Sequence, residues 1–564
     1  MKVQSSHHRW ILSIALALLA ACGSDKPDPT PDAGVPDSGV PDSGVPDSGV
    51  PDAGPKPAQF TLSVSSDKVP VLQGSNALLK VTVIRESGFT GAVSLALSGL
   101  PTGVTAPSPT ISSGAEAADV QLDAAGTAPH SLPTTVTVTG TSGDQTATKT
   151  FTLTVRGPAG SVDTSFGGGP VITGINTSED YARAIAVQPD GKIVVAGSTN
   201  TSQQGYDFAV ARYNRDGTLD TDFNTSGKVT TTLTNQADEG YAVALQADGK
   251  IVVAGTTTEG TNVQRFAVVR YNSNGSLDTG FGTSGKAVTS FASGPDRAYA
   301  IAIQPDGKIL VGGEATVTAT GLDFALVRYN TDGSLDTGFG TGGKVLTAIK
   351  AATGRDAINA LALQNVGGET RIVAAGGEGD FLLARYTSNG TLDSSFGTGG
   401  KVASVFGSTI GSAFAVTTIS DGKLVVAGYS SNDFSLARLT DTGALDSSFG
   451  TAGKVVTRLN TSNTDIATAV AVQSDGKIVA AGWVNAGATS AADFAVLRYD
   501  STGAPDNSFG TGGTVITQVA APGKSDKANA LALQPDDRVP VVRILVAGQA
   551  DGNNSDFALT RYWP

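Results

Sequence analysis

The chain has 564 residues, a formal net charge of −13 at pH 7, one cysteine and three histidines. A negative charge with no basic stripe argues against nucleic acid as a partner, and a single cysteine excludes an intramolecular disulfide. The histidines stand at positions 7, 8 and 130. The repeats that follow therefore contain no His-dependent nucleophile and no His-ligated metal.

The N-terminus has the pattern of an export signal. Lys2 and Arg9 precede an apolar run over residues 11–20, which is too short for a permanent membrane helix. The run ends in Leu-Ala-Ala-Cys at residues 19–22, which resembles the bacterial lipobox. The resemblance implies a lipoprotein signal peptide over residues 1–21 and an acylated Cys22 that anchors the protein to a membrane. The alternative is an ordinary signal peptide with an incidental cysteine.

Residues 22–57 predict a disordered tether. They repeat Pro, Asp, Ser and Gly without aromatic residues, so they cannot bury enough apolar surface to offset the entropy of ordering. Regular proline and like charges favour an extended chain. We expect a spacer between a membrane anchor and the folded part.

Residues 58–157 predict a β-sandwich, because short alternating strands are separated by Gly, Pro and Ser turns. The stretch FTGAVSLALSGLPTGVTA, residues 89–106, resembles the Ig-like modules of secreted bacterial proteins. The sequence lacks the Cys-Trp-Cys core of antibody domains, so packed aliphatic residues are expected to form the core.

From residue 161 the chain is repetitive. Each unit holds four alternating runs joined by Gly or Asp-Gly turns, which favours a seven-bladed β-propeller over residues 161–564, with a β-solenoid as the alternative. The clearest marker is the phenylalanine after the turn that joins the third and fourth runs: Phe166, Phe223, Phe281, Phe339, Phe396, Phe449 and Phe509.

These units resemble the delta-60 repeat, a bacterial family of unknown function expected to form propellers. The matching residues are QPDGKIVVAG, residues 188–197, and DFAVARYNRDGTLDTDF, residues 207–223. The resemblance implies a fold and an envelope context, but no catalytic residue or cofactor.

The ends of the repeat region predict how a ring would close. The region begins with the tail of a unit, at residues 161–173, and its last unit stops after a third strand, at DFALTRYWP. The strand over residues 171–173 is therefore expected to complete the last blade and to cover its open edge.

One residue pair recurs in every unit. An arginine in the third strand precedes an aspartate in the following turn, as in Arg212 with Asp220, Arg270 with Asp278, and Arg328 with Asp336. Since no single ligand contacts all blades equally, we interpret these as structural ion pairs. The neighbouring Asn and Asp residues are interpreted as turn supports, and no metal site is predicted.

A ligand site is expected where the units differ. The loops between second and third strands are short in the fourth and fifth units, which predicts a notch beside the axis. Tyr429 and Trp483 share one position in neighbouring units, and Phe414 lies near them. We expect these aromatic side chains to form a shallow site with Asp356 and Asp465 at its rim, for a neutral glycan, a peptide or a protein. The alternatives are that the rings pack between blades and that each Asp caps its own turn.

The sequence thus favours a monomeric, non-enzymatic binding or adhesion lipoprotein of the cell envelope, on the outer membrane or cell surface. The alternatives are a carboxylate- or cofactor-dependent extracytoplasmic propeller enzyme and a purely structural envelope protein.

Overall fold

The computed structural model describes residues 60–564, apart from residues 87, 202–204, 262, 292–293, 351–353, 461–463, 487–490 and 537–540. The predicted signal peptide, Cys22 and the tether lie outside this range. The described residues belong to one compact unit. The part of the chain that is described contains strands and turns but no helix, so it holds no helix able to cross a membrane. The all-β prediction is confirmed.

Two sheets over residues 60–156 share one apolar core. One pairs β1 (Phe60–Val64), β3 (Asn76–Arg85), β7 (Ala117–Ala124) and β5 (Val104–Thr105), and the other pairs β2 (Lys68–Leu72), β9 (Gln145–Arg156), β8 (Thr134–Ser142), β4 (Val93–Ser98) and β6 (Thr110–Ile111). Their strands alternate buried and exposed residues, as half-buried antiparallel sheets do. Leu79, Val120 and Val136 are fully buried, so aliphatic packing forms this core.

In the described residues, seven further sheets each contain four antiparallel strands, and one of them has a fifth, parallel strand. Their strands, sheet by sheet, are β11 (Asp180–Val187), β12 (Ile193–Asn200), β13 (Tyr206–Tyr213) and β14 (Lys228–Thr231); β15 (Asp238–Leu245), β16 (Ile251–Glu259), β17 (Val263–Tyr271) and β18 (Lys286–Thr289); β19 (Asp296–Ile303), β20 (Ile309–Val317), β21 (Gly321–Tyr329) and β22 (Lys344–Thr347), with β23 (Gly354–Arg355) beside β21; β24 (Ile358–Val366), β25 (Glu369–Gly376), β26 (Leu382–Tyr386) and β27 (Lys401–Val402); β28 (Gly411–Thr418), β29 (Leu424–Ser430), β30 (Asp433–Leu439) and β31 (Lys454–Thr457); β32 (Asp465–Val472), β33 (Ile478–Ala486), β34 (Ala491–Tyr499) and β35 (Thr514–Thr517); and β36 (Asp526–Asp536), β37 (Val541–Asp551), β38 (Ser555–Tyr562) and β10 (Val171–Thr173).

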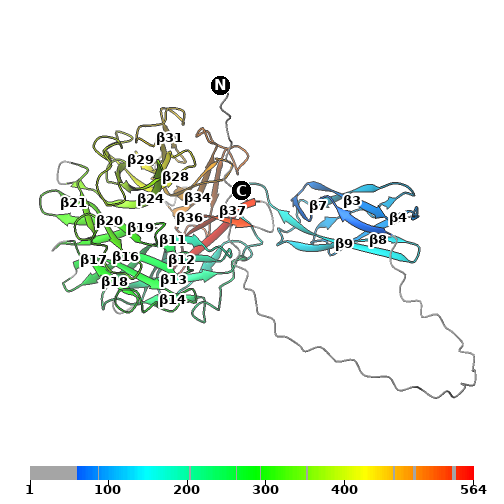
Figure 1. Cartoon of the computed structure of the whole chain (residues 1–564), viewed down its shortest axis with the longest axis horizontal. Coiled ribbons are helices and arrows are strands. Elements are labelled where there is room, and N and C mark those ends of the chain that lie inside the picture. Colours follow the sequence, from blue (N-terminus) through cyan, green and yellow to red (C-terminus); the bar gives the residue numbers. More distant parts are fainter. Residues whose placement is uncertain are drawn as a thin grey trace, which may run out of the picture. The chain divides into compact units, whose positions relative to one another are not determined.

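These sheets form a closed ring. The first strand of each sheet contacts the first strand of the next, and β36 of the last sheet contacts β11 of the first. In Figure 1, β11, β19, β24, β28 and β36 gather toward the middle of the ring, while β14, β18 and β31 lie outside. The second and third strands are buried on both faces, because each sheet is covered by two neighbours. This explains their continuous apolar runs.

The last sheet is built from both ends of the repeat region. Residues Val171–Thr173 of β10 pair antiparallel with Phe557–Leu559 of β38. The N-terminal strand therefore covers the edge that the C-terminal strand would otherwise expose. The apolar cluster behind it joins Phe166 and Ile193 to Leu545 and Phe557, so the same packing continues across the point where the ring closes.

Candidate functional site

Every first strand of the ring carries one β-bulge at the same place. One residue is left without a partner in the second strand, as Arg183 is between Ala182 and Ala184. A bulge re-aims its extra residue, and bulges are frequent next to functional sites. The extra residues are Arg183, Tyr241, Tyr299, Asn359, Phe414, Thr468 and Asn529.

A glycine on the second strand makes each bulge possible. A Cβ at Gly197 would lie 1.8 Å from the carbonyl oxygen of Tyr181, and one at Gly482 would lie 1.8 Å from that of Ile466. Only glycine permits this approach of one backbone to another. The equivalent residues with the same close approach are Gly255, Gly313, Gly376, Gly428 and Gly548.

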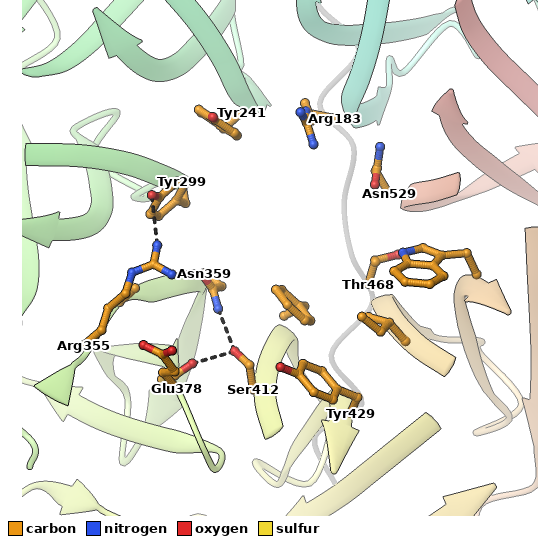
Figure 2. Close-up of a pocket in the computed structure, with 15 residues that line it drawn as sticks. Arg183, Tyr241, Tyr299, Arg355, Asn359, Glu378, Ser412, Tyr429, Thr468 and Asn529 are labelled. Carbon is orange, nitrogen blue, oxygen red and sulfur yellow. Dashed lines mark hydrogen bonds between the residues drawn. The ribbon is translucent and has the colours of Figure 1, made fainter. Parts of the chain in front are cut away.

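The bulge residues line one cavity on the ring axis, with a volume of about 480 Å³. All seven of them border it, so every sheet of the ring contributes a side chain. Figure 2 shows Arg183, Tyr241, Tyr299 and Asn529 around one opening, with Tyr429 and Thr468 on its other sides. The remaining lining residues are Arg355, Ala357, Gly377, Glu378, Ser412, Ile466 and Trp483, together with Asn359 and Phe414.

Five of the fifteen residues that line the cavity are aromatic. Phe414 and Tyr429 stack with ring centroids 6.0 Å apart and planes inclined by 18°. The rings of Tyr241 and Tyr299 pack edge to face, with their centroids 5.2 Å apart. Trp483 lies 5.0 Å from the ammonium nitrogen of Lys527. All five rings are half-buried, so part of each surface is available to a ligand.

A buried carboxylate stabilises one side of the wall. Glu314 is fully buried and accepts hydrogen bonds from Arg297 Nη1 at 2.9 Å, Arg355 Nε at 2.6 Å and the Tyr299 hydroxyl at 3.0 Å. Burial and the charge of Glu314 raise the pKa of Tyr299 to about 12, while its hydrogen bond to Glu314 raises the pKa of Arg355. Tyr299 therefore stays neutral and Arg355 stays charged at physiological pH.

Polar bulge residues link neighbouring sheets. Asn359 Nδ2 donates to the carbonyl of Ala413 at 2.8 Å, and Asn529 Nδ2 donates to that of Ala182 at 2.8 Å. Thr468 Oγ1 donates to the carbonyl of Ala528 at 2.9 Å. Each acceptor immediately precedes the bulge residue of the next sheet, so these bonds fix neighbouring bulges relative to one another.

The structure brings three of the predicted site residues together. Tyr429, Trp483 and Phe414 all line the cavity. Their rings are half-buried, so they are not fully enclosed between sheets. The site is also wider than expected, because it extends around the whole axis. Sequence reasoning missed Arg183, Tyr241 and Tyr299, although a variable residue flanked by two small ones, as in ARA, GYA and AYA, marks the position.

The expectation that Asp356 and Asp465 stand at the rim is wrong. Both side chains are buried and neither lines the cavity. Asp356 accepts hydrogen bonds from the backbone N–H groups of Ile349 and Lys350 at 2.9 and 3.0 Å. Asp465 does the same for its own loop, with Leu459 N at 3.0 Å. A carboxylate that satisfies buried loop N–H groups has a structural role.

The fifth unit, which has Gly411 in place of this aspartate, obtains the same support from elsewhere. Asp380 in the preceding sheet accepts the N–H groups of Phe406 at 2.9 Å and Gly407 at 2.8 Å. The break in the sequence pattern is therefore compensated by a neighbouring carboxylate, and it does not mark a ligand contact.

The recurrent Arg and Asp residues form ion pairs in the turns. The distances from Nε to Oδ2 are 2.6 Å for Arg212 and Asp220, 2.8 Å for Arg270 and Asp278, and 2.7 Å for Arg328 and Asp336. Each of these arginines also donates through Nη1 to a backbone carbonyl of the next sheet, at Ser273, Thr331 and Ser388. The pairs therefore join neighbouring sheets as well as fixing a turn.

Comparisons with known proteins agree with the ring of repeats. A family model described as a domain of unknown function (DUF5122) beta-propeller matches residues 188–223, 246–281, 304–339, 366–396, 419–449 and 473–509. With the closed ring of four-stranded sheets, this match defines a β-propeller domain. No curated protein matches the sequence.

Solved structures show only distant likeness. A quinoprotein alcohol dehydrogenase-like protein from Bacteroides thetaiotaomicron is 11% identical, with a TM-score of 0.35 over 79% of this chain and 94% of that one. A DUF4784 family protein from Bacteroides caccae is 10% identical, with a TM-score of 0.27 over 83% and 97%. A tail fibre of Staphylococcus aureus phage P68 is 10% identical, with a TM-score of 0.23 over 47% and 50%. At these TM-scores the likeness carries no argument.

Proposed function

We propose that this chain is a lipid-anchored envelope protein whose seven-bladed β-propeller, of the delta-60 repeat type, binds a ligand in the axial cavity. Acylation at Cys22 would attach it to the membrane, on the outer membrane or cell surface. The tether at residues 22–57 and an Ig-like domain at residues 58–157 would hold the propeller away from the membrane. Binding through the cavity would make the protein an adhesion or interaction platform.

The observation that carries this proposal is the variability of the bulge position. The glycine opposite each bulge and the ion pair in each turn recur around the ring, as scaffold residues would. The bulge residues themselves are Arg, Tyr, Asn, Phe or Thr, although they occupy equivalent places. Hydrogen bonds between sheets account for Asn359, Thr468 and Asn529. They do not account for Arg183 or the aromatic bulge residues, which a ligand that meets each sheet differently would explain.

The lining also favours binding over catalysis. The cavity volume falls in the range of about 300–1,000 Å³ that is typical of ligand pockets. Its described lining offers aromatic faces, amides and the guanidinium groups of Arg183 and Arg355, with Glu378 as the single carboxyl group. Among the described residues no cluster of His, Cys, Asp or Glu has the composition of a metal site. We therefore propose a glycan as the ligand, with a peptide as the alternative.

The test is binding to an array of envelope glycans and extracellular-matrix proteins. Tyr429→Ala and Trp483→Ala are compared with wild type and with Val456→Ala, which removes an exposed apolar side chain from the outer strand β31. We expect the two cavity variants to lose binding by about tenfold or more, with Val456→Ala unchanged. If all three variants bind as wild type does once folded, the ligand site lies elsewhere.

A further inference from the structure

The cavity carries a cationic group although the chain as a whole is strongly acidic, with a formal net charge of −13. We propose that Arg183 receives a carboxylate of the ligand, so that the site selects acidic sugars such as uronic acid residues. This inference rests on the proposed function, because it names the ligand class of the same cavity.

The charge of the other lining arginine is already compensated. Arg355 contacts Glu314 through Nε at 2.6 Å and through Nη2 at 3.1 Å. Arg297 also pairs with Glu314, at 2.9 Å. The two arginines share one buried carboxylate, and Arg355 is held in place by it. Arg355 is therefore committed to Glu314 and is not a free receptor for a ligand carboxylate.

Arg183 is different. Its guanidinium carbon lies 5.3 Å from the ring centroid of Tyr181 and 5.6 Å from that of Tyr241. Its buried Nε has no hydrogen-bond partner, and within the described residues Arg183 forms no ion pair. The terminal nitrogens of Arg183, unlike Nε, are not buried, and they form no hydrogen bond with the described residues. A carboxylate in the cavity can accept hydrogen bonds from both terminal nitrogens, since the two groups match in geometry.

Nearby acids do not occupy this position. Glu239 accepts the hydroxyl of Tyr241, and the burial of Tyr241 and the charge of Glu239 raise the pKa of that tyrosine. Asn529, which borders the cavity beside β11, donates to the carbonyl of Ala182. The donors of Arg183 are therefore the ones left for a ligand on this side.

The rest of the wall fits a sugar ring better than an isolated anion. Five aromatic side chains offer flat faces on which the C–H face of a pyranose packs: Tyr241, Tyr299, Phe414, Tyr429 and Trp483. The side-chain oxygens of Asn359 and Asn529 accept no hydrogen bond from the described residues. They can accept from sugar hydroxyls.

The experiment uses an array of glucuronic, galacturonic and mannuronic acid oligosaccharides, each paired with its carboxyl-reduced counterpart. The reduced sugars keep the ring and lose only the charge. Wild type is compared with Arg183→Gln, with Arg183→Lys, and with Arg371→Gln as a control. Arg371 pairs with Glu369 and Asp393 at the other end of β25 from the cavity.

We expect wild type to bind at least one acidic oligosaccharide about tenfold or more tightly than its reduced form, as one charge-assisted hydrogen bond requires. Arg183→Gln should abolish the preference, Arg183→Lys should keep part of it, and Arg371→Gln should leave it intact. Equal binding of both forms, or a preference that survives in Arg183→Gln, overturns the inference. Binding of neutral glycans alone overturns it but spares the proposed function, whereas no binding across either array overturns both.

Discussion

Arg561 Nε lies 2.9 Å from Asp163 Oδ2, although 398 residues separate the two in the chain. The pair is the counterpart of Arg212 with Asp220, where the partners are only eight residues apart. Arg561 also donates to the carbonyl of Arg215 in the first sheet, at 2.6 Å. One turn is thus assembled from both ends of the repeat region, and the same contact holds the last sheet against the first.

Replacing this carboxylate should weaken the whole ring. Asp163 and Arg561 are both buried, and removing one partner of a buried pair costs about 3–5 kcal/mol. We expect Asp163→Asn to lower the midpoint of urea unfolding more than Asp336→Asn, which breaks the same pair within one turn and is more exposed. Equal midpoints for the two variants would contradict a special role for the closing pair.

The bulges depend on the glycines opposite them. Alanine at Gly482 would place its Cβ 1.8 Å from the carbonyl oxygen of Ile466, so the bulge at Thr468 must open or shift. We expect Gly482→Ala to lose about 2 kcal/mol or more of stability and to disturb the cavity. Gly552→Ala is the control, since its Cβ would come no closer than 3.6 Å to a neighbouring atom. Similar thermal unfolding of both variants would show that the close approach is unimportant.

Two kinds of aspartate predict opposite pH effects. Burial raises the pKa of Asp238, although hydrogen bonds from Thr257 and from backbone N–H groups oppose this. A carboxyl group whose pKa is higher in the folded protein than in the unfolded chain destabilises the fold when it is ionised. This loss of stability is present above the pKa of the folded protein. It disappears as the pH falls from that pKa to the pKa in the unfolded chain, which is about 3.9. The Asp238→Asn substitution would also weaken the hydrogen bonds that the carboxylate accepts from Leu233 N and Thr234 N. The stability of Asp238→Asn relative to wild type should therefore be most favourable near neutral pH and should become less favourable in acid.

Asp446 behaves in the reverse way. Hydrogen bonds from Ser448, Lys423 and Arg438 lower the pKa of its carboxyl group. Its contribution is present above the unfolded value of about 3.9 and is lost as the pH falls through the lower folded pKa. Asp446→Asn should therefore be less stable than wild type at neutral pH, and the deficit should shrink only in strong acid. Unfolding free energies measured from pH 7 to pH 3 distinguish the two variants, and parallel curves would refute the assignment.

Much of this architecture could be predicted from the sequence, because each unit repeats its own turn chemistry. The sequence predicts propeller-like repeats from the marker phenylalanines and from the recurring Arg and Asp pairs. It predicts how the two ends of the repeat region meet from the strand at residues 171–173. The bulges could not be predicted as easily. A bulge is defined by the pairing register between two strands, which one strand's sequence does not contain. The sequence of β11 is compatible with a regular strand as well as with a bulged one.

The predicted rim acids failed for a related reason. The sequence shows that Asp356 and Asp465 occupy equivalent positions near the start of the first strand of their units. It does not show whether their carboxylates face the cavity or the loop that precedes the strand. In the fifth unit, where Gly411 stands in place of this aspartate, Asp380 of the preceding sheet supports the loop instead. Compensation across sheets is visible only once the ring is assembled.

The proposed membrane attachment has a simple test. Acylation at Cys22 would place the mature protein in the membrane fraction. The mass of its N-terminal peptide would show the loss of the signal peptide and the gain of the lipid. We expect Cys22→Ala to move the protein from the membrane to the soluble fraction after cell lysis. Unchanged membrane partition together with an unchanged N-terminal mass would show that Cys22 carries no anchor.

If the axial cavity holds the ligand, filling the cavity with a larger side chain should abolish binding. Thr468→Phe introduces an aromatic ring at a bulge whose equivalent in the neighbouring sheet already carries Phe414, so the strand tolerates the residue. The glycan that wild type binds on the array is titrated into both proteins by calorimetry, and their melting temperatures are compared. We expect Thr468→Phe to melt within a few degrees of wild type and to lose binding by about tenfold or more. A folded Thr468→Phe variant that binds this glycan with wild-type affinity would contradict binding in the axial cavity.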